Sequence, residues 1–150
     1  MTRTLYKTLF LLVLSLALSA CRADDTRAVT MVGYNYTDRP IGTFSVNGVG
    51  GSNVFAKEES GGGKMSCCVD VTVGKMVRID WVYHRTEKQE LAGFKIEDHS
   101  TVAVVPPPQT PESDYLEVHF FPNNHVELRL VKFPGRARWD EIPNHGALND

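Results

Sequence analysis

The residue types best suited to chemistry in this chain are its three cysteines. Cys67 and Cys68 are adjacent and follow a run of glycines at 61–63. Consecutive α-carbons lie about 3.8 Å apart across a trans peptide, below the span of about 4.4–6.8 Å that disulfides prefer. Because neighbouring strand residues also point to opposite faces, a Cys67–Cys68 disulfide requires a distorted turn, for which the glycines provide room.

Three interpretations of the Cys67–Cys68 pair stay open. The two residues form a vicinal disulfide that stiffens a loop, or they are unbonded thiols of which one is buried on a sheet face. A redox or metal-binding role is the third interpretation, and it lacks Cys-x-x-Cys spacing and nearby histidines. In an oxidising compartment these two thiols are each other's nearest partners once Cys21 is set aside.

Cys21 ends a short apolar segment that follows a basic N-terminus. The apolar run Leu9–Leu18 has the length of about ten residues typical of a secretory signal, short of the roughly 20 needed to span a bilayer. Residues 18–21 (Leu-Ser-Ala-Cys) resemble a bacterial lipobox, in which the peptide is cut before the cysteine and the cysteine carries lipid. The resemblance implies a lipoprotein signal peptide over 1–20 and a lipid anchor at Cys21. The alternative is an ordinary signal peptide with a chance cysteine.

The residues after the predicted anchor indicate where the protein is held. Arg22 follows Cys21, whereas lipoproteins retained in the inner membrane often carry Asp at this position. We therefore expect a periplasmic protein, lipid-anchored in the inner leaflet of the outer membrane, with residues 21–28 as a polar tether. The formal net charge is -2 and no long cluster of Lys and Arg occurs, so nucleic-acid binding lacks its usual electrostatic basis.

Between residues 29 and 133 apolar residues recur with a period close to two, which is typical of half-buried strands. The runs 116–121 and 126–130 flank Pro122-Asn123-Asn124, a turn sequence in which Asn tolerates positive φ, and so predict a hairpin. In 75–84 the pattern predicts that Val77, Ile79, Trp81 and Tyr83 lie on one face and Arg78, Asp80 and His84 on the other. The other predicted strands are 30–36, 43–47, 66–73, 94–97 and 101–105.

These short strands, separated by Gly, Pro and Asn turn signals, predict an all-β fold. The expected architecture is an antiparallel β-sandwich or open barrel over residues 29–133. The sequence Thr86-Glu87-Lys88-Gln89 resembles a capping box and indicates a single helical turn at most. From Pro134 the alternation stops, so we expect the tail 134–150 to lie extended over the domain or to be loose.

Signatures of catalysis are weak in this sequence. Asp80 and Glu117 form a carboxylate pair only if their strands are neighbours; otherwise they are charges on a solvated sheet face. His119 and His125 flank the predicted hairpin, but the five histidines show no metal-binding spacing. The sequence therefore predicts a binding protein, with no catalytic residues, no metal and no cofactor.

Candidate partner contacts are charged residues on the predicted polar strand face and one tryptophan in the tail. Trp139 either covers the sheet or is an exposed anchor, since Trp is enriched among interface hot spots. The glycine loops at 48–51 and 61–63 are either hairpin connections or a flexible recognition surface. The charged candidates are Arg78, Asp80, Glu117 and Glu127.

Several segments together resemble one uncharacterised family of small lipoproteins. They are Gly33-Tyr34-Asn35-Tyr36-Thr37-Asp38-Arg39-Pro40-Ile41, Phe44-Ser45-Val46-Asn47-Gly48, Gly61-Gly62-Gly63, Cys67-Cys68-Val69 and Val118-His119-Phe120-Phe121-Pro122. Members of that family open with Asn-Tyr-Thr-Asp, carry Cys-Cys after a glycine run, and are often encoded beside type VI secretion lipase effectors. The resemblance implies an immunity protein that binds and neutralises a phospholipase effector in the periplasm. A structural or scaffolding envelope lipoprotein without a toxin partner is the alternative.

Overall fold

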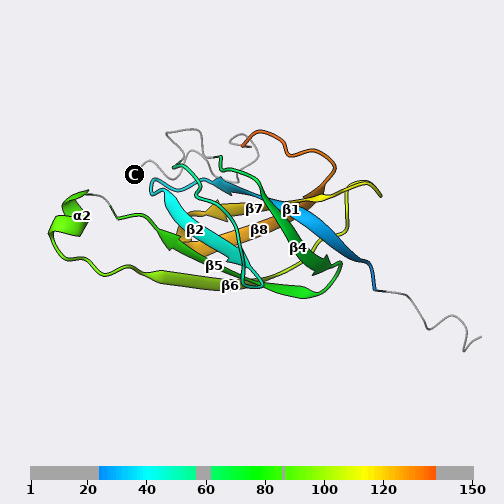
Figure 1. Ribbon diagram of the computed structural model, residues 1–150, viewed down its shortest axis with the longest axis horizontal. Helices are drawn as coiled ribbons and strands as arrows, with labels where there is room; N and C mark the ends of the chain where they lie inside the picture. The colour runs from blue at the N-terminus through cyan, green and yellow to red at the C-terminus, as the bar shows by residue number, and fades with distance from the viewer. Residues whose placement is uncertain (1–23, 57–61, 86, 138–150) are drawn as a thin grey trace, which may run out of the picture.

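A computed structural model of the chain describes residues 24–56, 62–85 and 87–137 (Figure 1). The predicted signal peptide, the anchor Cys21 and the tail residue Trp139 lie outside the described residues. Two four-stranded sheets pack against each other and form a β-sandwich, which confirms the predicted all-β class. Within the described ranges no helix is long and apolar enough to cross a membrane.

The first sheet has the strand order β4-β1-β7-β8 and the second has the order β3-β2-β5-β6. Neighbouring strands are antiparallel except β1 and β7, which run parallel. The chain builds the whole second sheet between β1 and β7, and this long connection allows a parallel pair. The strands are β1 (Thr26–Asn35), β2 (Ile41–Val46), β3 (Val49–Gly50), β4 (Ser66–Thr72), β5 (Met76–Tyr83), β6 (Asp98–Val104), β7 (Tyr115–Phe121) and β8 (His125–Val131).

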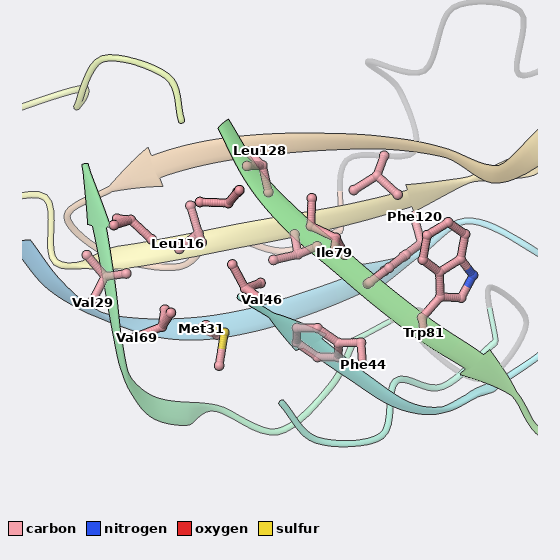
Figure 2. Packing of buried hydrophobic residues seen from close by; sticks show 14 of the residues in the cluster. Val29, Met31, Phe44, Val46, Val69, Ile79, Trp81, Leu116, Phe120 and Leu128 are labelled. Atoms are coloured by element: carbon pink, nitrogen blue, oxygen red, sulfur yellow. The ribbon is translucent and has the colours of Figure 1, made fainter. Parts of the chain in front are cut away.

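The core lies between the inner faces of the two sheets (Figure 2). The predicted inward face of β5 is confirmed, because Val77, Ile79, Trp81 and Tyr83 are all buried. Phe120 of β7 in the first sheet packs against two aromatic residues of the second sheet. Its ring centroid lies 5.5 Å from that of Phe44 and 5.6 Å from that of Trp81. Burying each large apolar side chain contributes about 1.5–3 kcal/mol, which makes this alternation the main determinant of the sandwich.

The hairpin between β7 and β8 forms where the sequence predicts it. The connecting 3₁₀ turn η2 (Pro122–Asn124) has φ values of 61° at Asn123 and 59° at Asn124. Asn accepts this left-handed conformation more readily than most residues, so the turn sequence closes the hairpin without glycine.

The N-terminal boundary of the domain differs from the prediction. β1 begins at Thr26 and pairs with β4 through residues 26–28, so these residues belong to the sheet and not to a tether. Arg27 fixes this start, because its guanidinium lies 2.8 Å from the Asp25 carboxylate and donates to the Ser113 carbonyl at 3.1 Å. A polar sequence thus begins an interior strand of the sheet, held by backbone pairing with β4 and by one bidentate ion pair.

The segment between β5 and β6 also differs from the prediction. The predicted helical turn is present as α2 (Glu87–Leu91), but the strand predicted at 94–97 does not form. Gly93 turns the chain with a φ of 70° directly after α2, and no described strand pairs with the residues that follow. Their alternating apolar side chains are therefore exposed instead of buried.

Candidate functional site

Two polar residues of β7 that the sequence places on a solvated face are buried. Glu117 and His119 have exposed fractions of 1% and 4%. They point away from the sandwich core, on the outer face of the first sheet, where Tyr34 of β1 and Tyr36 directly after β1 lie beside them. We call these four residues the outer-face cluster. The prediction of a solvated strand face is wrong here, because the chain that follows β8 covers this face.

Hydrogen bonds connect three residues of the outer-face cluster in a chain, from Glu117 through His119 to Tyr36. The Glu117 Oε2 atom lies 3.2 Å from His119 Nε2, and His119 Nδ1 lies 2.9 Å from the Tyr36 hydroxyl. These contacts are satisfied when His119 Nε2–H donates to the carboxylate and Tyr36 O–H donates to Nδ1. The His119 ring also stacks on Tyr34, with ring centroids 4.9 Å apart.

Residues 134–137, which we call the strap, cover this cluster. The Gly135 N–H donates to Glu117 Oε1 at 2.9 Å, and the Tyr34 hydroxyl donates to the Gly135 carbonyl at 2.6 Å. Ala137 packs against the apolar parts of the cluster. The strap therefore lies over the outer face of the first sheet, and the rest of the predicted tail lies outside the described residues.

The environment of the outer-face cluster fixes its charge. Burial alone raises the pKa of Glu117, but the hydrogen bonds from His119 and the Gly135 N–H, with the nearby charge of Arg129, outweigh burial and lower the pKa below its ordinary value. Burial, followed by the negative charge of Glu117, raises the pKa of Tyr34 well above its ordinary value. At neutral pH the cluster thus holds a carboxylate and a protonated Tyr34, which together clamp the strap.

The other charged candidates form ordinary surface ion pairs. Arg78 and Asp80 lie on the outer face of the second sheet with a nitrogen–oxygen distance of 2.8 Å. Glu127 contacts His125 at 3.1 Å. The strands of Asp80 and Glu117 belong to different sheets, so the carboxylate pair that the sequence left open does not form.

The two histidines that flank the hairpin have different environments. His119 is buried in the outer-face cluster, whereas the His125 side chain is 62% exposed. In the β7–β8 register His119 lies opposite Glu127, and His125 lies opposite Phe121, so the two rings do not converge. Among the described residues no group of three or more His, Cys, Asp and Glu could hold a metal ion.

The structure joins Cys67 and Cys68 by a vicinal disulfide. The pairing of β1 with β4 explains its place: Val29 lies opposite Val69 and Met31 opposite Ser66, so the two cysteines together oppose a single residue of β1. This is a β-bulge, which lets two consecutive side chains both reach solvent. The distorted turn expected from the sequence is thus a bulge inside a strand.

The glycine loops act mainly as connections where they are described. Asn47 and Gly48 both have positive φ, as two-residue hairpin turns require. Gly51 passes so close to Phe44 that a Cβ atom there would overlap the aromatic ring. The interpretation of 48–51 as a hairpin connection therefore accounts for its glycines.

One site that the sequence pattern did not reveal lies at the end of the sandwich where β5 and β7 end. An open depression of about 460 Å³ is lined there by Thr37, Asp38, Arg39, Tyr83, His99 and residues 122–124, with Tyr36 at its wall. We call it the end pocket. Its sequence signal is the segment Asn35–Arg39, but the lining residues of β5 and β6 are brought to it only by the fold.

A second feature at the same end is the projecting connection between β5 and β6, described over residues 84–85 and 87–97, which includes α2 and which we call the arm (Figure 1). Leu91, Phe94 and Ile96 have exposed fractions of 82%, 58% and 55%, and α2 buries none of its residues. The base of the arm is fixed, because Arg85 donates to the Phe94 carbonyl at 3.1 Å and contacts Glu90 at 3.6 Å.

Comparison with known proteins identifies a family. Residues 34–128, more than half of the chain, match the family described as "Protein of unknown function (DUF3304)". No curated protein and no solved structure matches the chain. The matched region runs from the end of β1 into β8 and contains the outer-face cluster, the disulfide, the end pocket and the arm. The chain therefore belongs to the DUF3304 family.

Proposed function

We propose that this protein is a lipid-anchored periplasmic immunity protein that binds and neutralises a type VI secretion phospholipase effector. The lipobox-like segment ending at Cys21 supports the anchor, and the resemblance of residues 31–133 to effector-associated lipoproteins supports the partner. The structural observation that carries the proposal is the exposed apolar surface of the arm.

The arm has the properties of a protein-binding element. Large apolar side chains gathered on a projecting segment mark interaction sites more often than single exposed residues do. Leu91, Phe94 and Ile96 form such a group, and the Arg85 contacts hold the base of the arm in place. An element ordered before binding loses less conformational entropy when the complex forms. A phospholipase offers a matching partner surface, since the mouth of its active site must accept acyl chains.

The position of the arm suits an anchored inhibitor. β1 begins at one end of the sandwich and the arm projects from the opposite end (Figure 1). Only four residues separate Cys21 from Thr26. A lipid at Cys21 would therefore hold the domain close to the bilayer with the arm directed away from it. Anchoring also concentrates the inhibitor on the surface that the phospholipase must reach.

Co-purification with the phospholipase encoded beside this chain tests the proposal. We expect a stable complex at micromolar concentration and loss of phospholipase activity on lipid vesicles. The F94S variant should weaken the complex by at least about tenfold, because Phe94 loses its apolar contact area. The F133S variant is the matched control, since Phe133 is also exposed (74%) and lies outside the arm.

Two results would overturn the proposal. One is the absence of a complex at micromolar concentration together with no protection of cells that express the phospholipase in the periplasm. The other is an equal effect of F94S and F133S, which would remove the arm from the interface.

The scaffolding alternative has its own observation. β6 is an edge strand, and its outward residues Val102 and Val104 are exposed beside Met76 of β5. An exposed edge with apolar side chains of this kind can pair with a strand of another protein. This function predicts that V102K, and not F94S, disrupts association with an envelope component and that no phospholipase is inhibited.

A further inference from the structure

We propose that the end pocket binds a carboxylate group through Arg39 and His99. The carboxylate belongs either to a small molecule or to an acidic side chain of a protein, because both present the same planar acceptor. The inference stands apart from the proposed inhibition of a phospholipase, since it rests on residues outside the arm surface.

The backbone that carries Arg39 is rigidly held. Asn35 is completely buried, and its side-chain Nδ2 donates to the Arg39 carbonyl at 2.7 Å. Its Oδ1 accepts from the Thr37 N–H at 3.0 Å and from the Thr37 hydroxyl at 2.8 Å. The segment Asn35–Arg39 thus forms a side-chain-locked turn, which is the kind of fixed loop that places binding residues.

The Arg39 guanidinium is held in a fixed orientation, but one of its hydrogen-bond donors has no partner among the described residues. Its guanidinium carbon lies 4.7 Å from the centroid of the Tyr83 ring, in a cation–π contact. The Nε atom is buried and has no hydrogen-bond partner within the described residues. Buried donors are nearly always paired, and the edge of a guanidinium matches the two oxygens of a carboxylate.

His99 provides a second donor to the same pocket. Its ring stacks on Trp81 at 5.3 Å and meets the edge of Tyr83 at 5.2 Å. The Nε2 atom is buried, and Glu97 Oε2 lies 3.8 Å away, which is beyond hydrogen-bonding distance. The sequence separates Arg39 and His99 by 60 positions, but both side chains contact the Tyr83 ring.

Trp81, whose ring stacks on His99, carries a further unpaired donor outside the pocket lining. Its indole Nε1 is buried without a partner in the described part of the chain. In Figure 2 the indole nitrogen points away from the labelled core side chains. Arg39 and His99 both line the end pocket and each has a buried nitrogen without a partner among the described residues, so an acceptor-rich ligand fits there. A carboxylate supplies acceptors together with a charge that complements Arg39.

Two carboxylates oppose such a ligand and limit its affinity. Asp38 lines the pocket and is exposed, and Glu97 approaches His99. We therefore expect weak binding of a free carboxylate, with a Kd of about 1–10 mM. Replacing Asp38 by Asn removes a like charge from the rim and should tighten binding by about two- to fivefold.

Titration of the full chain with N-acetyl-L-glutamate tests the proposal. The probe should shift the NMR signals of the Arg39 Nε–H and Trp81 Nε1–H groups in a saturable manner. N-acetyl-L-glutamine amide, which is nearly isosteric and carries no carboxylate, should bind at least about fivefold more weakly. The R39Q variant should lose about tenfold in affinity. The R78Q variant, which removes an exposed arginine from the outer face of the second sheet, should bind like wild type.

Several results of these titrations would overturn the proposal. Equal shifts with both probes, or unchanged binding by R39Q when its other backbone signals match wild type, would overturn the proposal. Absence of saturable shifts in wild type and in D38N would do the same. If binding is confirmed, titration with a short peptide that contains one glutamate, capped at both ends, distinguishes the sources: binding tighter than that of N-acetyl-L-glutamate assigns the carboxylate to a protein side chain, and weaker binding assigns it to a small molecule.

Discussion

At the scale of single residues, Glu117 and His119 show that a segment later in the chain can bury residues that an alternating pattern places on an outer face. Their positions in β7 correctly predict that they point away from the core. The strap then covers them and supplies the Gly135 N–H as a partner for the carboxylate. A buried charge of this kind is tolerated because every carboxylate oxygen has a donor.

We expect Glu117→Gln to lower the free energy of unfolding by about 1–3 kcal/mol, because a neutral amide replaces a carboxylate that accepts two buried hydrogen bonds. The control is Glu127→Gln, whose exposed contact with His125 should contribute no more than about 0.5 kcal/mol. Urea unfolding of the three proteins measures both values. Equal destabilisation by the two substitutions would contradict a role of the Glu117 carboxylate in holding the strap.

The lowered pKa of Glu117 predicts that the stability of the domain depends on pH. Because folding lowers the pKa of Glu117, its contribution to stability is fully present above the unfolded-state pKa and is lost as the pH falls through the folded-state pKa. The difference in unfolding free energy between wild type and E117Q should therefore shrink as the pH decreases from about 5 toward 3. Unfolding curves at a series of pH values measure it, and a constant difference would exclude this origin.

At the scale of elements, β4 shows how a strand accommodates adjacent cysteines. The bulge opposite β1 adds one residue to β4, so Cys67 and Cys68 both face solvent while Val69 and Val71 stay buried. The alternation after the bulge is therefore preserved. A bulge with a disulfide on the free edge of β4 also hinders pairing with another strand.

Reduction of this disulfide should leave the sandwich folded. The bond closes a loop between consecutive residues, so it removes little chain entropy and should stabilise the domain by about 1 kcal/mol at most. Dithiothreitol should lower the melting temperature of wild type by only a few degrees and leave a C67S/C68S variant unchanged. Unfolding of wild type on reduction would show that the disulfide is essential to β4.

At the scale of the whole molecule, the two ends of the sandwich have different surroundings. The start of β1 lies at one end and the arm at the other (Figure 1). The end pocket lies near the base of the arm, because Tyr83, the last residue of β5, lines it. An anchored chain would thus present the arm and the mouth of the end pocket to the periplasm. The segment from Cys21 to Thr26 spans at most about 17 Å when extended, so the domain would stay near the lipid surface.

The predicted lipid anchor can be tested separately from binding of the phospholipase. The Cys21→Ser variant should lose membrane attachment, because acyl chains contribute about 0.8 kcal/mol per buried methylene group. It should still bind the phospholipase in solution but protect cells poorly, since its concentration at the membrane falls. Fractionation and a protection assay measure the two effects. A C21S chain that stays in the membrane fraction would place the attachment elsewhere.

The sequence by itself determined the all-β class, the inward faces of β5, β7 and β8, and the Asn turn of the hairpin, because strand period and turn propensity are local properties. It placed Arg78 and Asp80 correctly on an outer face. Only the tertiary structure decided the parallel β1–β7 pair, the burial of Glu117 under the strap and the meeting of Arg39 with His99. Each of these depends on contacts between distant segments, and a period of two reports which side a residue faces without reporting what covers that side.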